Sequence, residues 1–433
     1  MDFLPPDWER VRLGDLFEIQ QGKALSPKAR AGINPKPFLR TANVFWGRLD
    51  LGTVDEMDFS DEEAAKLALR PGDLLVCEGG DIGRTAIWQG ELPLCCCQNH
   101  VHRLRARDTG VEPQFVMLWM EAAIRLLGLY GGQGNKTTIP NLSKSRLAAF
   151  EVPLPPLAEQ RAIAEVLLVV QRTKDATEKV IAALRELKMS LLKHLFTYGP
   201  VPFNQADKVP LKETEVGAIP EGWNVARLGD ISDWMRYGTS RRCHPQPQGL
   251  PVLRIPNVIN SSINTADLKF VEMDKKEADR YRLQVRDLLF VRTNGQREYV
   301  GRCAVYEGEP EHCLFASYLI GVRVRPDEVL ADYIRLYALT PAGRRFLSGR
   351  ASGAADGKFN INTQTLRSVM LPVPPIEMQR RIVHAVDAAD AGMAAAGQRF
   401  TALEATFKLL LGQLMTGKVR LPGFGTPSAS AGG

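Results

Sequence analysis

The feature that most restricts the fold of this chain is a proline-containing phrase that occurs twice, each time directly before a long helical pattern. Residues 154–161 read LPPLAEQR, and residues 373–380 read VPPIEMQR. Proline is tolerated before the first turn of a helix, because the N–H that it lacks would have no partner there. The two copies therefore predict two helices that begin at matched points of a duplicated chain.

The first helical pattern runs from Leu157 to Leu195 without a further Pro or Gly. Its apolar or small residues recur at intervals of three and four, which is the spacing of a coiled-coil seam. At a rise of 1.5 Å per residue the helix would be roughly 58 Å long, too long for a single compact domain. The predicted seam consists of Ile163, Val166, Val170, Thr173, Thr177, Val180, Leu184, Leu187 and Leu191.

The second helical pattern keeps the same spacing, although Gly392, Gly397 and Gly412 lower its intrinsic helix stability. It needs a packing partner, and the first helix matches it in length and in opening phrase. We expect the two helices to pair as an antiparallel coiled coil, with two separate bundle helices as the alternative. The predicted second seam consists of Ile382, Val386, Ala389, Met393, Ala396, Phe400, Leu403, Phe407, Leu410 and Leu414.

Outside the helices, the chain consists of two units that share several phrases at a nearly constant offset. Residues 8–15 read WERVRLGD and residues 223–230 read WNVARLGD. Short apolar segments edged by Gly, Asp and Asn follow in both units and predict globular domains rich in strands. Each unit also has one helical segment, near residues 114–128 and 330–347. Other matched segments are 38–44 with 252–258, 72–76 with 286–290, and 83–87 with 301–305.

The predicted architecture is α+β, with two similar globular domains separated by two long helices in a pseudo-two-fold repeat. With 433 residues, of which 45% are hydrophobic, the chain can bury the cores of two or three domains. The predicted boundaries are a first domain at 1–153, a central coiled-coil helix at 154–198, a linker at 199–222, a second domain at 223–372, a C-terminal coiled-coil helix at 373–416 and a flexible tail at 417–433.

The composition predicts a cytoplasmic protein without a membrane segment. No stretch of eighteen apolar residues is present, and the first residues have neither the basic start nor the apolar core of an export signal. Seven cysteines, an odd number, suit a reducing compartment. Cys95, Cys96 and Cys97 could form a metal cluster with His100 and His102, but they lack CxxC spacing and better fit a buried strand. We expect no metal site.

We find no motif for catalysis. The glycine-rich loops at 131–138 and 349–360 do not have the spacing of a phosphate-binding loop. The nucleophile elbow of hydrolases, the HExxH helix of zinc proteases and the NPPY or DPPY motif of amino-methylating enzymes are absent as well. These absences favour a binding protein over an enzyme, so we predict no catalytic residue. A nuclease or methyltransferase with an unfamiliar site is the enzymatic alternative.

A duplicated chain suits a ligand that also repeats, and duplex DNA is such a ligand. Dimeric DNA readers contact half-sites roughly 34–36 Å apart. The net charge of +6 is compatible with an anionic partner without demanding one.

The doubled proline phrase, together with the Trp and Leu-Gly-Asp that open each unit, resembles the specificity subunit of type I restriction-modification systems. The resemblance covers essentially the whole chain apart from the tail. It implies two target recognition domains, a coiled coil that sets the spacing of a bipartite, asymmetric DNA site, and no catalytic activity in this chain. The main alternative is a non-catalytic, two-headed protein-interaction scaffold that does not bind DNA.

The resemblance also implies partners and cofactors. The expected partners are double-stranded DNA, two modification subunits that methylate adenine N6, and restriction subunits. S-adenosylmethionine, ATP and Mg²⁺ are expected on those partner subunits, and this chain is expected to bind no cofactor.

Carried onto this sequence, the resemblance places candidate DNA contacts in matched loops of the two units. Arg can bind guanine O6 and N7, Asn can pair with adenine N6 and N7, and Lys most often contacts phosphate. For each residue, a surface charge or a turn-capping Asn is the alternative. The candidates are Lys23, Arg40, Asn43, Arg84 and Lys136 in the first unit, and Arg241, Arg254, Asn257, Arg302 and Lys358 in the second.

Overall fold

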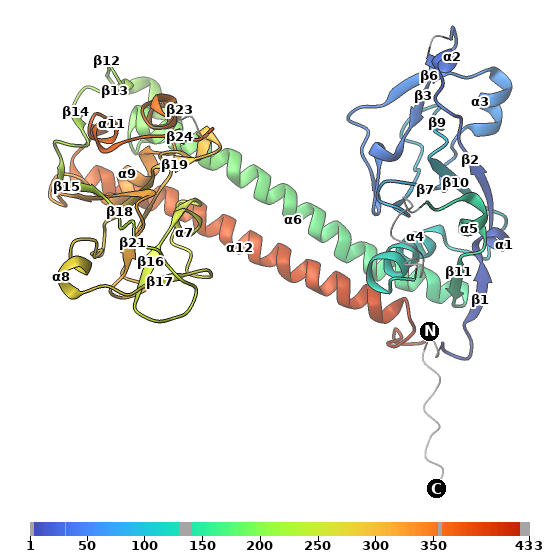
Figure 1. The fold of residues 1–433 in the computed structure, drawn as a ribbon. Coiled ribbons are helices and arrows are strands. Elements are labelled where there is room, and N and C mark those ends of the chain that lie inside the picture. The colour runs from blue at the N-terminus through green and yellow to red at the C-terminus, as the bar shows by residue number, and fades with distance from the viewer. Residues whose placement is uncertain (1–3, 31, 130–140, 354–356, 425–433) are drawn as a thin grey trace. The chain divides into compact units, whose positions relative to one another are not determined.

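The chain divides into two compact units, each of which combines one globular domain with part of both long helices (Figure 1). The computed structural model describes residues 4–30, 32–129, 141–353 and 357–424. Unit 1 comprises residues 1–178 and 398–433, and unit 2 comprises residues 179–397.

The long helices are α6 (Leu157–Tyr198) and α12 (Ile376–Leu414), which begin directly after the two proline pairs. In unit 1 the beginning of α6 shares a core with the end of α12, since Ile163 clusters with Leu411. In unit 2 the end of α6 shares a core with the beginning of α12, since Leu195 clusters with Ile382. The helices are therefore paired antiparallel within each unit, as predicted.

The predicted seam of α6 is wrong at two of its nine positions. Ile163 and Thr177 are buried as expected, but Val180 and Leu187 are each 51% exposed. Beside Leu187 the inward position belongs to Lys188, whose Nζ lies 2.5 Å from Asp390, and beside Thr173 the partly buried Lys174 lies over the Phe407 ring. Two lysines thus contribute to the seam, and two predicted apolar residues lie outside it. Apolar spacing alone could not identify this arrangement, since intervals of three and four fit neighbouring rows equally.

The seam of α12 is confirmed over most of its length. Ile382, Val386, Phe407 and Leu414 are buried, and the residues predicted between Val386 and Phe407 are partly buried. At Leu410 the burial passes to its neighbour Leu411.

The glycines of α12 are not required for helix contact. A Cβ on Gly397 would meet no atom within 4 Å, so Gly397→Ala is expected to stabilise the chain by about 0.5–1 kcal/mol through the better helix propensity of alanine. Gly343→Ala provides the opposite control, since its Cβ would lie 2.1 Å from the carbonyl oxygen of Tyr337. Urea denaturation of both variants tests the prediction, and a destabilised Gly397→Ala would contradict it.

The repeated glutamine of the proline phrase joins each helix to its domain. Gln160 is buried; its amide donates to the Pro155 carbonyl at 2.8 Å, and its carbonyl accepts from the Glu112 N–H at 2.8 Å. Gln379 makes the matched bonds to Pro374 at 2.9 Å and to Leu330 at 2.9 Å. Each glutamine therefore joins the proline turn to the residue that precedes a helix of the globular domain, Glu112 or Leu330. This shared role explains why Gln recurs in the phrase.

The domain of unit 1 is built on a four-stranded sheet in the order β2-β10-β7-β8, against which α4 packs. A three-stranded sheet, β6-β3-β9, contains the only parallel strand pair of this domain among the described residues. The elements are β1 (Glu9–Arg12), α1 (Leu13–Leu16), β2 (Phe17–Gln21), α2 (Pro27–Arg30), β3 (Pro35–Leu39), η1 (Thr41–Asn43), β4 (Val44–Phe45), β5 (Arg48–Leu49), β6 (Asp55–Asp58), α3 (Asp61–Leu67), β7 (Leu74–Cys77), β8 (Thr85–Ile87), β9 (Cys96–Cys97), β10 (Val101–Ala106), α4 (Pro113–Glu121), η2 (Ala122–Leu126), α5 (Lys144–Ala148) and β11 (Glu151–Leu154).

The domain of unit 2 repeats this topology with the four-stranded sheet β15-β22-β18-β20 and the three-stranded sheet β17-β16-β21. The predicted helix near 330–347 is broken into α9 and α10, because Thr340 caps a new helix that begins at Pro341. The elements are η3 (Phe203–Lys208), β12 (Leu211–Thr214), β13 (Gly217–Pro220), β14 (Asn224–Arg227), β15 (Ser232–Tyr237), β16 (Leu250–Leu253), α7 (Ile255–Val258), β17 (Lys269–Val271), α8 (Lys275–Ala278), β18 (Leu288–Val291), β19 (Thr293–Asn294), η4 (Arg297–Tyr299), β20 (Cys303–Val305), β21 (Leu314–Phe315), β22 (Leu319–Val324), α9 (Ala331–Tyr337), α10 (Pro341–Phe346), η5 (Ser348–Arg350), β23 (Ser352–Gly353), β24 (Phe359–Asn360), α11 (Thr363–Arg367) and β25 (Met370–Val373).

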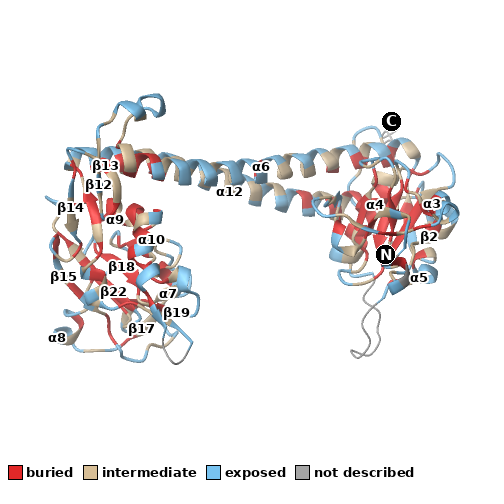
Figure 2. Cartoon of the chain, turned by 90° about the horizontal axis from the view of Figure 1, so that it is seen from above, coloured by how far each residue is buried: buried red, intermediate tan, exposed pale blue. Residues whose placement is uncertain are grey.

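Buried residues gather in the sheets and in the helices that cover them, whereas the outer faces of α6 and α12 are exposed (Figure 2). Matched ion pairs support both sheets. Asp73 accepts from Arg105 at 2.8 and 2.6 Å, and Asp287 accepts from Arg323 at 2.7 Å through both carboxylate oxygens. The α+β fold with a pseudo-two-fold repeat is therefore confirmed within the chain.

Two predicted connecting segments are more ordered than expected. The linker at 199–222 contains η3 and the hairpin β12–β13, and its Ile219 is buried in the core of unit 2. The tail predicted from residue 417 begins with a segment in which Arg420 binds Asp7 and Glu159.

The cysteine run lies at strand β9 and its start, where Cys95, Cys96 and Cys97 are all buried, as the strand interpretation predicted. Among the described residues no group of three or more His, Cys, Asp or Glu is arranged to hold a metal ion. In the same part of the chain, no helix is long and apolar enough to span a membrane.

Candidate nucleic-acid interface

The turns after β7 and β18 present a matched arginine in each domain. Gly83 and Gly301 adopt φ angles of 77° and 76°, a conformation that favours glycine. A Cβ on either glycine would also collide with a neighbouring side chain, at 2.1 Å from Ile124 or 2.5 Å from Leu347. The tight turn therefore fixes the backbone position of the next residue, which is Arg84 in unit 1 and Arg302 in unit 2.

The two arginines differ in their surroundings. Arg84 donates to the Thr41 carbonyl at 2.9 Å and lies 3.7 Å from the Asp81 carboxylate. Arg302 lies over the Tyr299 ring at 4.2 Å and makes a long bond of 3.4 Å to the Ile259 carbonyl. Within the described residues, Arg302 has no carboxylate partner.

A second guanidinium lies near Arg302. Arg344 donates to the carbonyls of Glu298 and Val300 at 2.7 and 2.8 Å, while its Nη1 is buried without a hydrogen-bond partner. Burial lowers the pKa of Arg344, and the neighbouring Arg302 lowers it further. Arg302 and Arg344 are adjacent cations, and neither forms an ion pair with a carboxylate within the described residues, which creates a local positive potential that favours an anion.

The basic loop of unit 2 lies next to this arginine pair. Arg297 donates to the carbonyls of Ser348 and Gly349 at 2.9 and 2.8 Å, and so ties the loop to η4. Strand β19 pairs with β24, directly after Lys358, which is exposed. The turn that carries Arg302 and the loop that carries Lys358 therefore belong to one surface region.

Arg292, Arg297 and Arg344 were not among the predicted contacts. A usable signal was present, because Arg292, Arg297 and Arg302 recur every five residues around Tyr299. Basic residues interleaved with aromatic ones are typical of nucleic-acid surfaces.

The predicted contacts Asn43 and Asn257 are structural residues instead. Both are buried, and each side-chain oxygen accepts the backbone N–H of the arginine three residues earlier, at 3.0 Å from Arg40 and 2.8 Å from Arg254. Each amide nitrogen donates to two carbonyls of the following loop. No amide group remains to pair with adenine, so the predicted role of both asparagines in base contact is corrected.

Four further predicted cations, besides Arg84, form ion pairs within their own domain. Lys23 Nζ lies 2.5 Å from Glu63, and Arg40 Nε lies 3.1 Å from Asp55. Arg241 and Arg254 each lie 2.7 Å from a carboxylate, of Glu277 and Asp267 respectively. Their charges are largely neutralised locally, which makes them weaker candidates for phosphate contact than Arg302. Lys136 lies outside the described residues.

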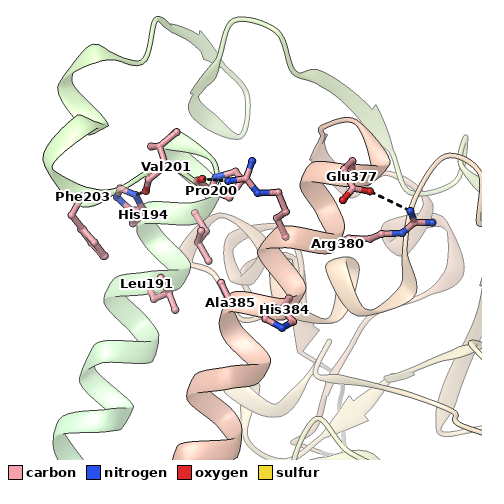
Figure 3. A pocket seen from close by; sticks show the side chains of 11 residues that line it. Leu191, His194, Pro200, Val201, Phe203, Glu377, Arg380, His384 and Ala385 are labelled. Atoms are coloured by element: carbon pink, nitrogen blue, oxygen red, sulfur yellow. Dashed lines mark hydrogen bonds and ion pairs between the residues drawn. The ribbon is translucent and has the colours of Figure 1, made fainter.

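A cavity of about 510 Å³ in unit 2 lies at the end of α6, beside the start of the linker and the first turns of α12 (Figure 3). His194 donates from Nε2 to the Val201 carbonyl at 2.7 Å and stacks on Phe203 with ring centroids 4.1 Å apart. None of the predicted DNA-contact residues lines this cavity. It is therefore distinct from the arginine-rich surface.

Comparison with known proteins gives two matches to one family model. The model of the type I restriction modification DNA specificity domain matches residues 5–186 and again residues 220–405.

Individual relatives match parts of the chain. The putative type I restriction enzyme MjaX specificity subunit of Methanocaldococcus jannaschii is 34% identical over 173 residues, which are 40% of this chain and 40% of that protein. The type I restriction enzyme EcoKI specificity subunit of Escherichia coli (strain K12) is 28% identical over 254 residues, covering 58% of this chain and 52% of that protein. The matches thus span about half or less of the length of these two relatives.

The fold is shared with a solved structure. The crystal structure of the type I restriction-modification system S subunit from M. genitalium has a TM-score of 0.56 at 15% identity, with 96% of this chain and 97% of that chain covered.

Proposed function

Because this chain belongs to the family of type I restriction-modification DNA specificity domains, we propose that it is the DNA-recognition subunit of such a system. Each globular domain reads one half of a bipartite, asymmetric duplex site, and the paired helices α6 and α12 set the spacer. The observation that carries the proposal is the repeated family match, which assigns one specificity domain to each half of the chain. The arginine-rich surface of unit 2 supports it, since phosphate contacts provide much of the affinity for DNA.

The chain acts without catalysis of its own in this proposal. It recruits two modification subunits that methylate adenine N6, and restriction subunits join that assembly in the cytoplasm. S-adenosylmethionine, ATP and Mg²⁺ bind to those subunits and not to this chain. Turnover of DNA by the isolated chain, supplied with Mg²⁺ and labelled S-adenosylmethionine, would contradict this division of labour.

Affinity selection from a pool of random duplexes tests the proposed function. We expect enrichment of two short motifs at a constant separation. A protein-interaction scaffold that does not bind DNA predicts a pool without enrichment, and enrichment of one uninterrupted motif would contradict reading by two domains.

The exposed apolar residues on α6 support the recruitment of partner subunits. Val180 and Leu187 are seven residues apart, so they lie on one face of the helix, and both are half exposed within unit 2. Isolated exposed apolar residues are common, but a row of them on a long helix suits a packing partner.

Leu187→Asp is expected to weaken binding of the modification subunit by tenfold or more, because a charge would enter the apolar contact, at roughly 1.4 kcal/mol per tenfold. The stability of the chain itself should change little, since the side chain is half exposed. Pull-down of purified modification subunit measures the effect, and Glu186→Gln, at an exposed neighbouring position, is the control. Unchanged binding by Leu187→Asp would exclude this face as the contact.

A further inference from the structure

Glu78 and Arg292 occupy the same structural position in the two domains. Each follows the central strand, β7 or β18. The backbone N–H of Glu78 donates to the His100 carbonyl at 2.9 Å, and that of Arg292 donates to the Tyr318 carbonyl at 3.0 Å. The carbonyl of Glu78 accepts from Leu142 at 2.9 Å, and the carbonyl of Arg292 from Ile361 at 3.0 Å. Matched bonds on both sides of the residue fix the same backbone placement.

The residues around this position are matched as well. Strand β2 ends at Gln21 opposite His102, and strand β15 ends at Tyr237 opposite Ile320, so Gln21 and Tyr237 correspond. The amide of Gln21 donates to the Asn99 carbonyl at 2.8 Å, and Arg292 Nη1 donates to the carbonyl of the corresponding Ser317 at 3.2 Å.

Both positions lie beside an exposed ring. The side chain of His100 is 58% exposed, and Tyr318 is 59% exposed. Each position thus combines an exposed ring with a hydrogen-bonding side chain. We therefore treat residues 21, 78 and 100 as one trio, and residues 237, 292 and 318 as the matched trio.

The trios carry opposite charge. In unit 1 the Glu78 side chain is 11% exposed; its carboxylate accepts from Gln21 Nε2 at 3.1 Å and lies 3.8 Å from His100 Nδ1. In unit 2 the Arg292 guanidinium lies over the Tyr237 ring at 4.4 Å. Its Nε is buried without a hydrogen-bond partner, and no carboxylate pairs with it within the described residues. The Nη2 group makes no hydrogen bond within the described residues and is not buried, so this partly exposed arginine, whose plane is set by stacking, is suited to a bidentate acceptor.

We infer that Glu78 and Arg292 select the base at equivalent positions of the two half-sites, with unit 2 reading guanine through Arg292 and unit 1 reading the amino group of cytosine through Glu78 and His100. The inference rests on the proposed function. Guanine presents O6 and N7 as a pair of acceptors in the major groove, which matches a guanidinium, whereas cytosine presents the N4 amino group as a donor, which matches a carboxylate. Opposite charge at one position makes the two half-sites different.

The test is affinity selection of random duplexes with the full chain, comparing the wild type with Arg292→Lys and Arg292→Gln. Lysine keeps the positive charge but loses the planar fork, so it maintains a phosphate contact and weakens a bidentate contact to guanine, whereas glutamine removes the charge as well. We expect both variants to lose at least about tenfold of the preference for guanine at one position of one half-site. The other half-site should stay unchanged. Preferences are ratios within one pool, so a loss of folded protein does not affect them.

Two controls complete the design. The first control is Arg236→Gln. Arg236 precedes Tyr237 in β15, so its side chain lies on the opposite face of the strand, over the Trp234 ring. This variant should leave the selected motif unchanged. In unit 1, Glu78→Gln should weaken the preference for cytosine in the other half-site only, while the exposed Glu56→Gln should not.

The outcomes separate the inference from the proposed function. If the wild type enriches no motif, the proposed function fails. If the wild type enriches two half-sites and both Arg292→Lys and Arg292→Gln keep the same motif, Arg292 contacts phosphate or nothing, and the inference is wrong although the function stands. A change in both half-sites by either variant would also overturn it, since each trio belongs to one domain.

Discussion

Arg420→Ala is expected to destabilise unit 1 by about 3–5 kcal/mol, the cost of leaving a buried charge without its partner. Glu159 is fully buried at the start of α6, and both of its oxygens accept from Arg420, at 2.9 and 2.6 Å. The same guanidinium donates to both oxygens of Asp7 at 2.7 Å. The Trp8 indole N–H, at 3.1 Å from Glu159, would be the only remaining donor to this carboxylate among the described residues.

Urea denaturation followed by tryptophan fluorescence measures this loss. Unit 2 provides a matched control, because Met378 replaces Glu159 in the second proline phrase, so the position has no carboxylate. Its neighbour Arg381 donates only to the Pro200 carbonyl, at 2.9 Å, so Arg381→Ala should cost about 1 kcal/mol or less. Adding Glu159→Gln to Arg420→Ala should restore part of the loss, since it removes the unpaired charge. Equal costs for the two arginine variants would show that the Glu159 contact contributes no more than a surface bond.

The double variant Arg302→Ala with Lys358→Ala is expected to lower the affinity for DNA between about ten- and a hundredfold at 0.1 M salt. Each phosphate contact releases counterions and contributes about 0.9 to the slope of log affinity against log salt, so the slope should fall by roughly 1.8. Arg302 lies beside Arg344 and has no carboxylate partner within the described residues, and the loop of Lys358 joins the same region.

The slope identifies which contact is lost. A loss of phosphate contacts weakens all sequences about equally, whereas the Arg292 variants should change base preference. Arg325→Ala is the control, because Arg325 is paired with Glu328 at 2.5 Å and its replacement should leave the slope unchanged. An unchanged slope in the double variant would exclude Arg302 and Lys358 from phosphate contact.

The buried asparagines show how a repeated sequence segment can suggest a binding role when its role is structural. The Arg-x-x-Asn segments recur at 40–43 and 254–257, and the recurrence suggested a repeated DNA contact. In the structure each Asn stabilises a turn. Its side-chain oxygen accepts the backbone N–H of the arginine three residues earlier, and its amide nitrogen donates to carbonyls of the following loop. A duplicated fold repeats its structural residues as faithfully as its binding residues, so recurrence alone does not distinguish them.

The pairing of α6 with α12 also shows what a sequence pattern alone cannot predict. Spacing of three and four determined that α6 forms a seam, and one row, including Ile163 and Thr177, is buried as predicted. In the other row Val166 and Thr173 are partly buried as predicted, but Val180 and Leu187 are exposed, and beside Leu187 the inward position belongs to Lys188, which pairs with Asp390 on α12. Lysine stems can pack in a seam when the ammonium reaches a ring or a carboxylate, and no pattern within α6 predicts that partner.

The sequence by itself determined the duplication, the two long helices with their starting points, and the family, because proline phrases and apolar periodicity act over a few neighbouring residues. Only the tertiary structure decided which cations remain available to DNA. Lys23 meets Glu63, and Arg241 meets Glu277, across 40 and 36 positions of the chain, whereas Arg302 meets another arginine. Whether a charge is neutralised depends on which distant residue the fold brings within a few ångströms, and local pattern does not encode that distance.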